Sequence, residues 1–368
     1  MTTVDADVRA RIARHGPIPF HEVVAAALYD EAAGFYATGG RAGRAGDFLT
    51  SPEVGPLFGT VVARALDSWW REAGEPSAFV VVEAGAGPGM LARTVLAASP
   101  ACAGALRYVM VERSSSQRSA HSERLSLENP VTAFAAVPDP ADDETRLPAP
   151  DGPIVVSIGE LPRLPGPCVV VANELLDNLP FGLLERTGDG WSEVRVGLDG
   201  GHLVEVLVPT EGNPVPRASV GARVPVQHTA ATWLREALDL AGAGGRVLAI
   251  DYASTTADLA ARPWTEWVRT YRRHERGGEP LAALGTQDIT CEVAIDQLGT
   301  APTSDRSQAD WLRAHGIDDL VEEGRRVWRE RAHLGDLEAV RARSRISEAE
   351  ALLDPTGLGA FRVLEWDL

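Results

Sequence analysis

Residues 80–90 of this 368-residue chain, VVVEAGAGPGM, decide its fold. An apolar run that begins at Phe79 ends in an acidic residue, glycine then recurs at every second position, and residues 91–98 have a helical pattern. Glycines at such a turn let the backbone pass close to a ligand, and doubly wound sheets bind cofactors at the carboxyl ends of their strands. The segment therefore predicts a cofactor loop after the first strand of an α/β fold.

Further apolar runs alternate with helical patterns along the chain. The expected strands are Phe79–Val82, Leu106–Val111, Cys168–Ala172 and Arg246–Ile250, with Val131–Ala135 as a weaker strand between the second and third of these. Continuous apolar strands that alternate with helices are typical of a parallel sheet covered on both faces. The fold class is thus α/β, with a Rossmann-like core.

The remaining segments indicate additions to this core. Residues 1–75 read as a helical extension, residues 76–306 as the core, and residues 307–368 as charged helices followed by a closing edge strand at Phe361–Trp366. Within the core, strand-like runs between about residues 181 and 209 are separated by Asp-Gly turns, which favour antiparallel hairpins. We expect a β-hairpin insertion there.

Composition limits the classes of function. The formal net charge is −17, which disfavours nucleic acid as a partner and would attract a cationic one. The sequence contains no lysine, so its 35 basic residues are all arginine. Three widely spaced cysteines and no histidine pattern predict neither disulfides nor a metal site. The chain shows neither a signal peptide nor an apolar run long enough to span a membrane, and we expect a cytoplasmic protein.

The spacing within the glycine loop indicates which cofactor it binds. A dinucleotide fingerprint would need glycine or alanine where Met90 stands, whereas the order E-x-G-x-G-x-G resembles the S-adenosylmethionine (AdoMet) loop of class I methyltransferases. Glu112 ends the next strand, where a carboxylate can accept both ribose hydroxyls. A glycine turn or a surface glutamate alone also occurs without a ligand, but the ordered pair favours a cofactor. The predicted cofactor contacts here are Glu83, Gly85, Ala86, Gly87, Gly89 and Glu112.

Three further segments make the resemblance specific. Residues 46–53, GDFLTSPE, resemble the GDF-x-TSPE signature of the MidA-like methyltransferases, and residues 173–180, NELLDNLP, resemble the segment that follows the fourth strand in that family. Residues 251–252, 271–274 and 288–290 match a late stretch of the same family, in the same order. The resemblance extends from about Gly16 to the C-terminus.

This resemblance implies an activity and a partner. Mitochondrial members of the family are protein arginine methyltransferases that assist assembly of respiratory complex I. By analogy we expect AdoMet as methyl donor, S-adenosyl-L-homocysteine as product, and a protein substrate such as a complex I-type subunit. Thr50, Ser51, Pro52 and Asn173 would join the cofactor site, and Asp47 and Glu174 lie in motifs that the resemblance assigns to the active site.

An arginine acceptor explains why acidic residues recur in these motifs. The guanidinium arrives charged, with a pKa above about 12, so carboxylates must hold it in a bidentate fork and help to remove a proton. The candidate catalytic residues are Asp47, Glu53, Asn173, Glu174 and Asp177. Each has a structural alternative, such as a turn former for Asp47, a capping-box partner for Glu53 and a solvated helix residue for Asp177. His274 is a weaker candidate for a general base.

Two other functions remain open from the sequence. The fold also supports methylation of small molecules on oxygen or nitrogen, and a chain of this kind could be a non-catalytic AdoMet-binding assembly factor. An acidic groove would favour a protein substrate, whereas a closed apolar pocket would favour a small molecule. Nothing in the sequence predicts the target protein, the degree of methylation or the oligomeric state.

Overall fold

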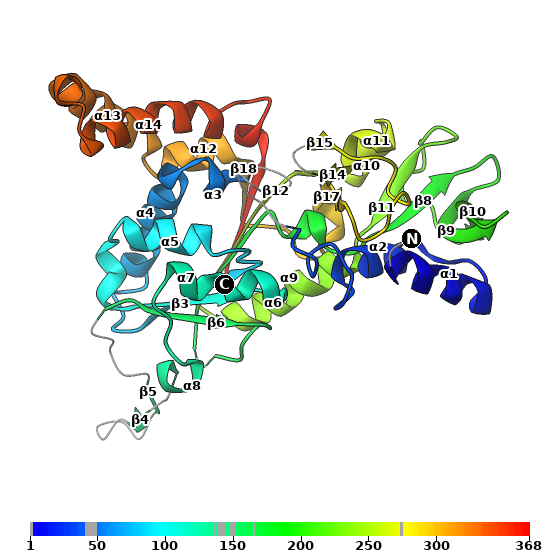
Figure 1. Cartoon of the computed structure of the whole chain (residues 1–368), viewed down its shortest axis with the longest axis horizontal. Coiled ribbons are helices and arrows are strands. Elements are labelled where there is room, and N and C mark those ends of the chain that lie inside the picture. The colour runs from blue at the N-terminus through cyan, green and yellow to red at the C-terminus, as the bar shows by residue number, and fades with distance from the viewer. Residues whose placement is uncertain are drawn as a thin grey trace. The chain divides into compact units, whose positions relative to one another are not determined.

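A computed structural model describes residues 3–40, 50–134, 137–138, 145–146, 152–164, 166–272 and 275–368 (Figure 1). The chain divides into two compact units. The N-terminal unit comprises residues 1–48, 174–237 and 251–301, and the sheet unit comprises residues 49–173, 238–250 and 302–368. Each unit therefore gathers segments that are distant in sequence, whereas the sequence analysis drew linear boundaries at residues 75 and 306.

The sheet unit is built on a seven-stranded sheet with the order β18-β19-β12-β7-β2-β3-β6. Its strands are β2 (Phe79–Ala84), β3 (Leu106–Val111), β6 (Ile154–Ile158), β7 (Val169–Asn173), β12 (Arg246–Asp251), β18 (Ser304–Ser307) and β19 (Arg362–Asp367). The neighbouring strands from β12 to β6 pair in parallel, and β18 pairs antiparallel with β19. This mostly parallel sheet confirms the predicted α/β, Rossmann-like class.

Two details of the predicted sheet are wrong. Residues 130–133 form helix α8, and the missing strand is β6, which begins at Ile154. The strand near the C-terminus, β19, exists but does not lie at the edge, because β18 pairs along its outer side. Buried valines, leucines and isoleucines fill the central strands β2, β3, β7 and β12, and their continuous burial matches strands covered on both faces.

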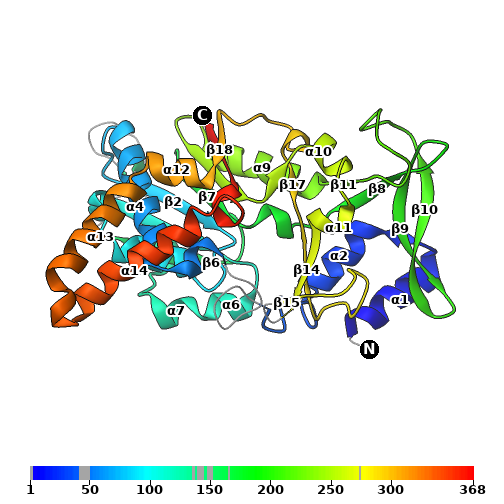
Figure 2. The ribbon, with the colours of Figure 1, turned by 90° about the horizontal axis from the view of Figure 1, so that it is seen from above.

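Helices lie beside the sheet in this unit, and the last two of them pack against each other (Figure 2). They are α3 (Ser51–Val54), α4 (Pro56–Glu72), α5 (Met90–Ala97), α6 (Ser115–Ser119), α7 (His121–Arg124), α8 (Pro130–Ala133), α12 (Gln308–Ala314), α13 (Ile317–Arg331) and α14 (Leu337–Leu352). A short pair of strands, β4 (Val137–Pro138) and β5 (Thr145–Arg146), follows α8. Helix α4 packs closely on α5 because Gly59 has no side chain: a Cβ there would lie 2.0 Å from the Thr94 hydroxyl oxygen. The helices at residues 308–352 agree with the predicted C-terminal helical layer.

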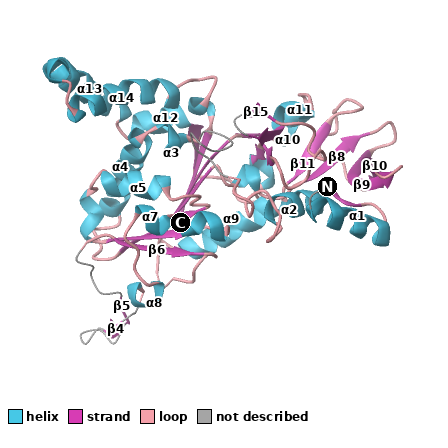
Figure 3. Ribbon diagram, viewed as in Figure 1, coloured by secondary structure: helices cyan, strands magenta, loops and turns pink. Residues whose placement is uncertain are grey.

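The N-terminal unit is built on an antiparallel sheet with the order β1-β9-β8-β11, and β10 pairs with β9 (Figure 3). The strands of this sheet are β1 (Ile18–Pro19), β8 (Gly182–Arg186), β9 (Trp191–Asp199), β10 (His202–Thr210) and β11 (Arg223–Val226). Two smaller sheets of the unit contain β13 (Ala253–Ser254), β14 (Val268–Arg272), β15 (Glu275–Arg276), β16 (Asp288–Cys291) and β17 (Val293–Ala294). Its helices are α1 (Thr3–His15), α2 (Phe20–Tyr29), α10 (Thr256–Ala260) and α11 (Trp264–Trp267), and α9 (His228–Ala241) is divided between the units.

The expected hairpin insertion is confirmed by β8, β9 and β10. Strands β9 and β10 are joined by Gly200 and Gly201, whose φ angles are 54° and 81°. Two central residues with positive φ form the type I′ turn that suits the twist of a hairpin, and glycine adopts it without strain. The Asp-Gly signal in the sequence therefore had a direct conformational cause.

Candidate functional site

The glycine loop between β2 and α5 has a conformation that requires glycine. Gly85, Gly87 and Gly89 have φ angles of 70°, 52° and 79°, in the left-handed region that other residues rarely adopt. At Gly89 a Cβ would also lie 3.2 Å from the His121 ring and 3.3 Å from the Met110 sulfur. The backbone N–H groups of Gly85 and Ala86 donate to the Val111 carbonyl, which ties the loop to β3.

Glu112, the first residue after β3, holds this loop. Its Oε2 accepts the Gly87 N–H at 2.9 Å, and its Oε1 accepts the Ser114 N–H at 2.7 Å. Burial raises the pKa of Glu112, and these two hydrogen bonds oppose the shift. A carboxylate has about four acceptor positions, so two remain after these bonds are made. Glu112 can therefore brace the loop and still accept two ribose hydroxyls.

Glu83 lies beneath the loop on β2 and is 4% exposed. The Tyr108 hydroxyl donates to its carboxyl at 2.8 Å, and burial raises the pKa of Glu83 to about 8. The group is thus largely protonated at neutral pH, unlike a surface glutamate. An ammonium placed beside it would favour its ionised form, so the predicted contact with the cofactor would be accompanied by release of a proton.

This raised pKa predicts how stability depends on pH. The folded state favours the protonated carboxyl, so its stabilising effect is complete below pH 4.5 and is lost as pH rises through about 8. Glu83→Gln removes the ionisation. Between pH 6 and pH 9 the free energy of unfolding of Glu83→Gln should rise relative to the natural chain by about 2–3 kcal/mol, at about 1.4 kcal/mol per pKa unit. Urea unfolding at both pH values measures the difference, and parallel curves would contradict a neutral buried carboxyl.

His121 contacts the same loop, and sequence reasoning missed it. It is fully buried on α7, its Nε2 lies 2.7 Å from the Gly87 carbonyl oxygen, and its Nδ1 lies 2.8 Å from the Ser157 hydroxyl. A single histidine nine residues after Glu112 carries no motif by itself. Its position next to the loop depends on contacts with Gly87 and with Ser157 of β6, which lie 34 and 36 residues away in the sequence.

A second cluster of functional groups lies in the N-terminal unit, where Asp177, Asp251 and Asp288 are buried together near Glu174. Burial, followed by the charges of Asp251 and Asp288, raises the pKa of Asp177 well above its usual value. Burial and the charge of Glu174 raise the pKa of Asp251 to about 8. The positive charge of Arg269 only partly opposes the rise in the pKa of Asp177, so four carboxyl groups lie here with one arginine near them.

Two of these carboxyl groups are occupied by the fold itself. Asp251 accepts the backbone N–H groups of Leu176 and Asp177 at 2.8 and 3.2 Å and that of Tyr252 at 2.9 Å. Asp288 accepts the Tyr36 hydroxyl at 3.1 Å and its neighbour's N–H at 3.0 Å, and it receives the Asn178 amide. Asp251 and Asp288 therefore fix the loop around Asp177.

Asp177 has a carboxyl oxygen that the described part of the fold leaves without a partner, and Glu174 is distinguished by its backbone. Asp177 is 5% exposed, and its Oδ1 has no hydrogen-bond partner among the residues that the structure describes. Glu174 has a φ of 52°, a left-handed conformation that costs a non-glycine residue about 1–2 kcal/mol. Strained backbone and a buried polar atom without a partner occur together at binding and catalytic sites. Both features fall on carboxylates that the sequence predicts as catalytic, three residues apart.

The remaining predicted residues belong to the sheet unit. Asn173 is the last residue of β7, paired with Ile250 of β12, and is joined directly to Glu174 along the chain. Ser51, Pro52 and Glu53 lie on α3, with Thr50 before them, and α3 contacts both α5 and α14. The Ser51 hydroxyl is fully buried and donates to Gln308 at 3.0 Å.

Two candidates from the sequence, Asp47 and His274, lie outside the described residues. Their placement relative to the other candidates therefore stays a prediction.

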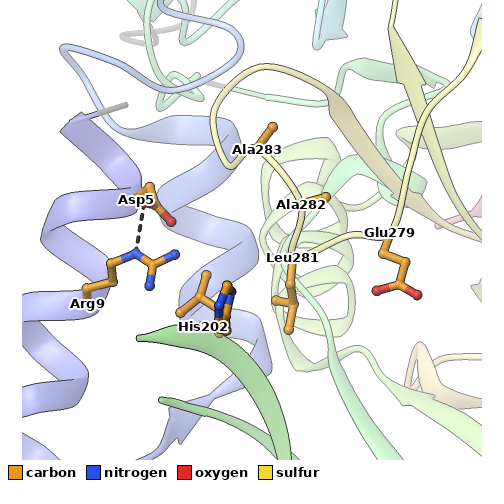
Figure 4. A pocket seen from close by; sticks show the side chains of 8 residues that line it. Asp5, Arg9, His202, Glu279, Leu281, Ala282 and Ala283 are labelled. Atoms are coloured by element: carbon orange, nitrogen blue, oxygen red, sulfur yellow. Dashed lines mark hydrogen bonds and ion pairs between the residues drawn. The ribbon is translucent and has the colours of Figure 1, made fainter. Parts of the chain in front are cut away.

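A recess of about 430 Å³ in the N-terminal unit lies apart from these residues (Figure 4). It is lined by Asp5, Arg9, residues 202–203, Glu279 and residues 281–283, and the Arg9 Nε donates to Asp5 at 2.8 Å. No predicted site residue lines it. Within the described part of the chain, no group of three histidine, cysteine or acidic residues is arranged to hold a metal ion, and no helix is long and apolar enough to cross a membrane.

Comparisons with known proteins agree with this geometry. Residues 61–312 match the profile of a family described as "Putative S-adenosyl-L-methionine-dependent methyltransferase". The chain is 28% identical over 300 residues to a mitochondrial protein arginine methyltransferase NDUFAF7 homolog of Drosophila melanogaster, covering 78% of this chain and 67% of that protein. It is 27% identical to mitochondrial protein arginine methyltransferase NDUFAF7 of Homo sapiens, covering 84% and 72%.

A solved structure extends the comparison to the whole chain. It is described as a "likely methyl transferase" from Burkholderia thailandensis bound to S-adenosyl-homocysteine. The match has a TM-score of 0.79 and 25% identity, and it covers 99% of this chain and 92% of that one.

One prediction from the sequence is contradicted. The curated relatives are named as mitochondrial proteins, which conflicts with the cytoplasmic location expected from the absence of a signal peptide. The absence of a secretory signal says nothing about transport into an organelle by another route, and this is where the sequence argument failed.

Proposed function

This chain belongs to the family of S-adenosyl-L-methionine-dependent methyltransferases, and we propose that it methylates arginine side chains of a partner protein. Membership rests on the family profile, which covers more than half of the chain, and it confirms the predicted enzyme class. The cofactor is AdoMet, as expected from the E-x-G-x-G-x-G spacing, and a structural relative contains its demethylated product.

The residues of the glycine loop fit this cofactor. AdoMet supplies a methyl group on a positively charged sulfur, which needs alignment more than activation. Gly85, Gly87 and Gly89 leave the loop backbone without side chains, and Glu112 keeps free acceptor positions for ribose hydroxyls. In our proposal Glu83 lies near the ammonium of the methionine part, and the chain's task is to orient the donor and exclude water.

The observation that carries the arginine proposal is the buried carboxyl of Asp177, whose Oδ1 has no partner among the described residues. A guanidinium presents five N–H donors in a planar fork, which matches two carboxylates better than the single point charge of lysine does. We assign the fork to Asp177 and Glu174, which are three residues apart and both adjoin Asp251.

The same carboxylates account for the proton that leaves during the reaction. The attacking guanidinium nitrogen gains a methyl group and gives up one proton, so the product keeps its positive charge. Loss of that proton is unfavourable in water, because the guanidinium pKa is above about 12. A carboxylate with a raised pKa accepts it more readily than an ordinary aspartate, and burial raises the pKa of Asp177.

The comparisons support a protein as the acceptor. The curated relatives are named protein arginine methyltransferases, and the strong negative charge of this chain suits an arginine-containing partner. By resemblance we propose a respiratory complex I-type subunit as the class of partner.

Transfer of labelled methyl groups tests this proposal directly. The purified chain is incubated with methyl-labelled AdoMet and lysate from cells that lack it, and the label is located by mass spectrometry. We expect label on arginine, and peptides from the labelled region should lose it when that arginine is replaced by lysine. Because all 35 basic residues of the enzyme are arginine, a reaction without lysate must first measure self-methylation.

Three results would contradict arginine methylation. Equal labelling of arginine and lysine peptides would show that the enzyme does not recognise the planar guanidinium through two carboxylates. Label only in small molecules would support the alternative of a small-molecule methyltransferase. Binding of S-adenosyl-L-homocysteine without transfer to any lysate component would support a non-catalytic assembly factor.

A further inference from the structure

Both backbone groups of Gly87 are held by buried side chains. The Gly87 N–H donates to Glu112 at 2.9 Å, and the Gly87 carbonyl lies 2.7 Å from the His121 Nε2. Glu112 was expected from the sequence as a contact of the ribose, whereas His121 has no expected contact with the cofactor. His121 is fully buried, so its contact with the loop is shielded from water.

The hydrogen bonds of His121 define its protonation state. A carbonyl oxygen can only accept, so Nε2 must carry a hydrogen. Nδ1 lies 2.8 Å from the Ser157 hydroxyl on β6, which donates to it when the ring is neutral. Burial and the positive charges of Arg118 and Arg124 lower the pKa of His121, and the backbone contact with Gly87 only partly opposes them. The neutral ring with hydrogen on Nε2 is therefore the form that fits.

The surroundings of His121 reinforce the same part of the loop. Arg124, three residues later on α7, donates to the Pro88 carbonyl at 3.0 Å. Helix α7 thus supplies donors to two successive carbonyls of the loop, while Ser157 connects His121 to the edge strand of the sheet. Glycine has the largest conformational freedom of any residue, so a loop with three left-handed glycines needs such restraints to keep one shape.

We infer that His121 is the positioning residue of the AdoMet loop, holding the Gly87 carbonyl so that the loop is ordered before the cofactor arrives. Without this donor, only a fraction of the protein molecules would have the loop in the conformation that binds the cofactor. The apparent dissociation constant of the cofactor then rises in inverse proportion to that fraction. The inference rests on the proposed placement of AdoMet on the glycine loop and does not depend on arginine as the acceptor.

Calorimetric titration of the full chain with S-adenosyl-L-homocysteine tests the inference. His121→Leu leaves a buried carbonyl without its donor, and we expect the dissociation constant to rise roughly ten-fold or more. His121→Gln places an amide N–H near the position of Nε2 and should restore affinity to within roughly three-fold. Because His121 contacts the loop at the Gly87 carbonyl, His121→Leu should raise the KM for AdoMet by a larger factor than it lowers kcat.

A matched control separates positioning from general packing. His315 lies in the same unit against Trp311, with ring centroids 4.4 Å apart, and has no contact with the glycine loop among the interactions described. His315→Leu should lower thermal stability without a change in affinity. Ser157→Ala removes the donor that selects the tautomer of His121 and should weaken binding less than His121→Leu does.

Several outcomes would overturn the inference. Unchanged affinity in His121→Leu would show that His121 only fills space. Affinity in His121→Gln as low as in the leucine variant would exclude the donor role. If His121→Leu does not fold, the glutamine and Ser157→Ala variants decide alone: a glutamine variant that folds but binds weakly contradicts the proposal.

Discussion

Gly87→Val should abolish measurable binding of S-adenosyl-L-homocysteine while the sheet unit remains folded. Gly87 has a φ of 52°, which a β-branched residue adopts only under strain of about 1–3 kcal/mol. Valine would turn the backbone away from this conformation, and the hydrogen bonds to Glu112 and His121 would be lost with it. Together these effects correspond to a loss of affinity of at least about a hundred-fold.

The fold should survive because the protein itself leaves room at this position. A Cβ on Gly87 would meet only the Gln117 Oε1, at an ordinary contact distance of 3.5 Å. Gly87→Ala should accordingly have an intermediate effect on affinity.

Gly242→Val is the matched control, since Gly242 has a φ of 65° and lies in the same unit, and a Cβ added to it would meet no atom within 4 Å. It should incur similar backbone strain and bind the cofactor normally. Undiminished binding by Gly87→Val in calorimetry would refute the placement of the cofactor on this loop.

The central strands could be predicted because their signal is local. Strands β2, β3, β7 and β12 are apolar along their length, since helices cover both faces of a parallel sheet. The edges were missed for the opposite reason. Strand β18, with the sequence SDRS, has no apolar pattern and exists because β19 offers it a partner. Strand β6 lies at the other end of the strand order in the described sheet. It follows a long segment rich in proline and acidic residues, and its short apolar run was therefore not recognised as a strand.

The residues of the candidate site also fall into those with a local sequence signal and those whose role depends on distant contacts. Gly85, Gly87, Gly89 and Glu112 were predicted because each needs only its own strand and the turn that follows. The roles of Asp251 and Asp288 depend on contacts across 74 and 110 residues, with Asp177 and Asn178 respectively. No single-sequence pattern contains such distances. One signal was available for Asp251, because an acidic residue ends β12 much as Glu83 lies near the end of β2.

Replacing Glu174 and Asp177 by their amides should separate cofactor binding from turnover. Glu174→Gln and Asp177→Asn keep the shape of each side chain and prevent it from ionising when a guanidinium binds. An imperfectly paired guanidinium in a partly dry site costs on the order of 2–5 kcal/mol, so methyl transfer should slow roughly thirty-fold or more. Affinity for S-adenosyl-L-homocysteine should be unchanged. Asp47→Asn should behave in the same way if Asp47 joins the fork.

Glu174 also allows a variant in which loss of activity cannot be ascribed to unfolding. Its φ of 52° suits glycine, so Glu174→Gly should raise the free energy of unfolding by about 1 kcal/mol while removing the carboxylate. We expect a more stable protein with the same loss of turnover. Glu211→Gln, an exposed change in the same unit, should alter neither property. Turnover and urea unfolding measured on the natural chain and on Glu174→Gln, Glu174→Gly and Glu211→Gln test these expectations.

The arginine mechanism requires both carboxylates, because a guanidinium held at one end can rotate away from the methyl donor. A small-molecule methyltransferase has no cation to hold and should tolerate at least one of the amide variants. Full activity in both Glu174→Gln and Asp177→Asn would therefore exclude the two-carboxylate fork, although AdoMet binding on the glycine loop would stand. Loss of turnover in both, with unchanged affinity for S-adenosyl-L-homocysteine and the expected gain in stability of Glu174→Gly, would leave charge at this site as the remaining cause.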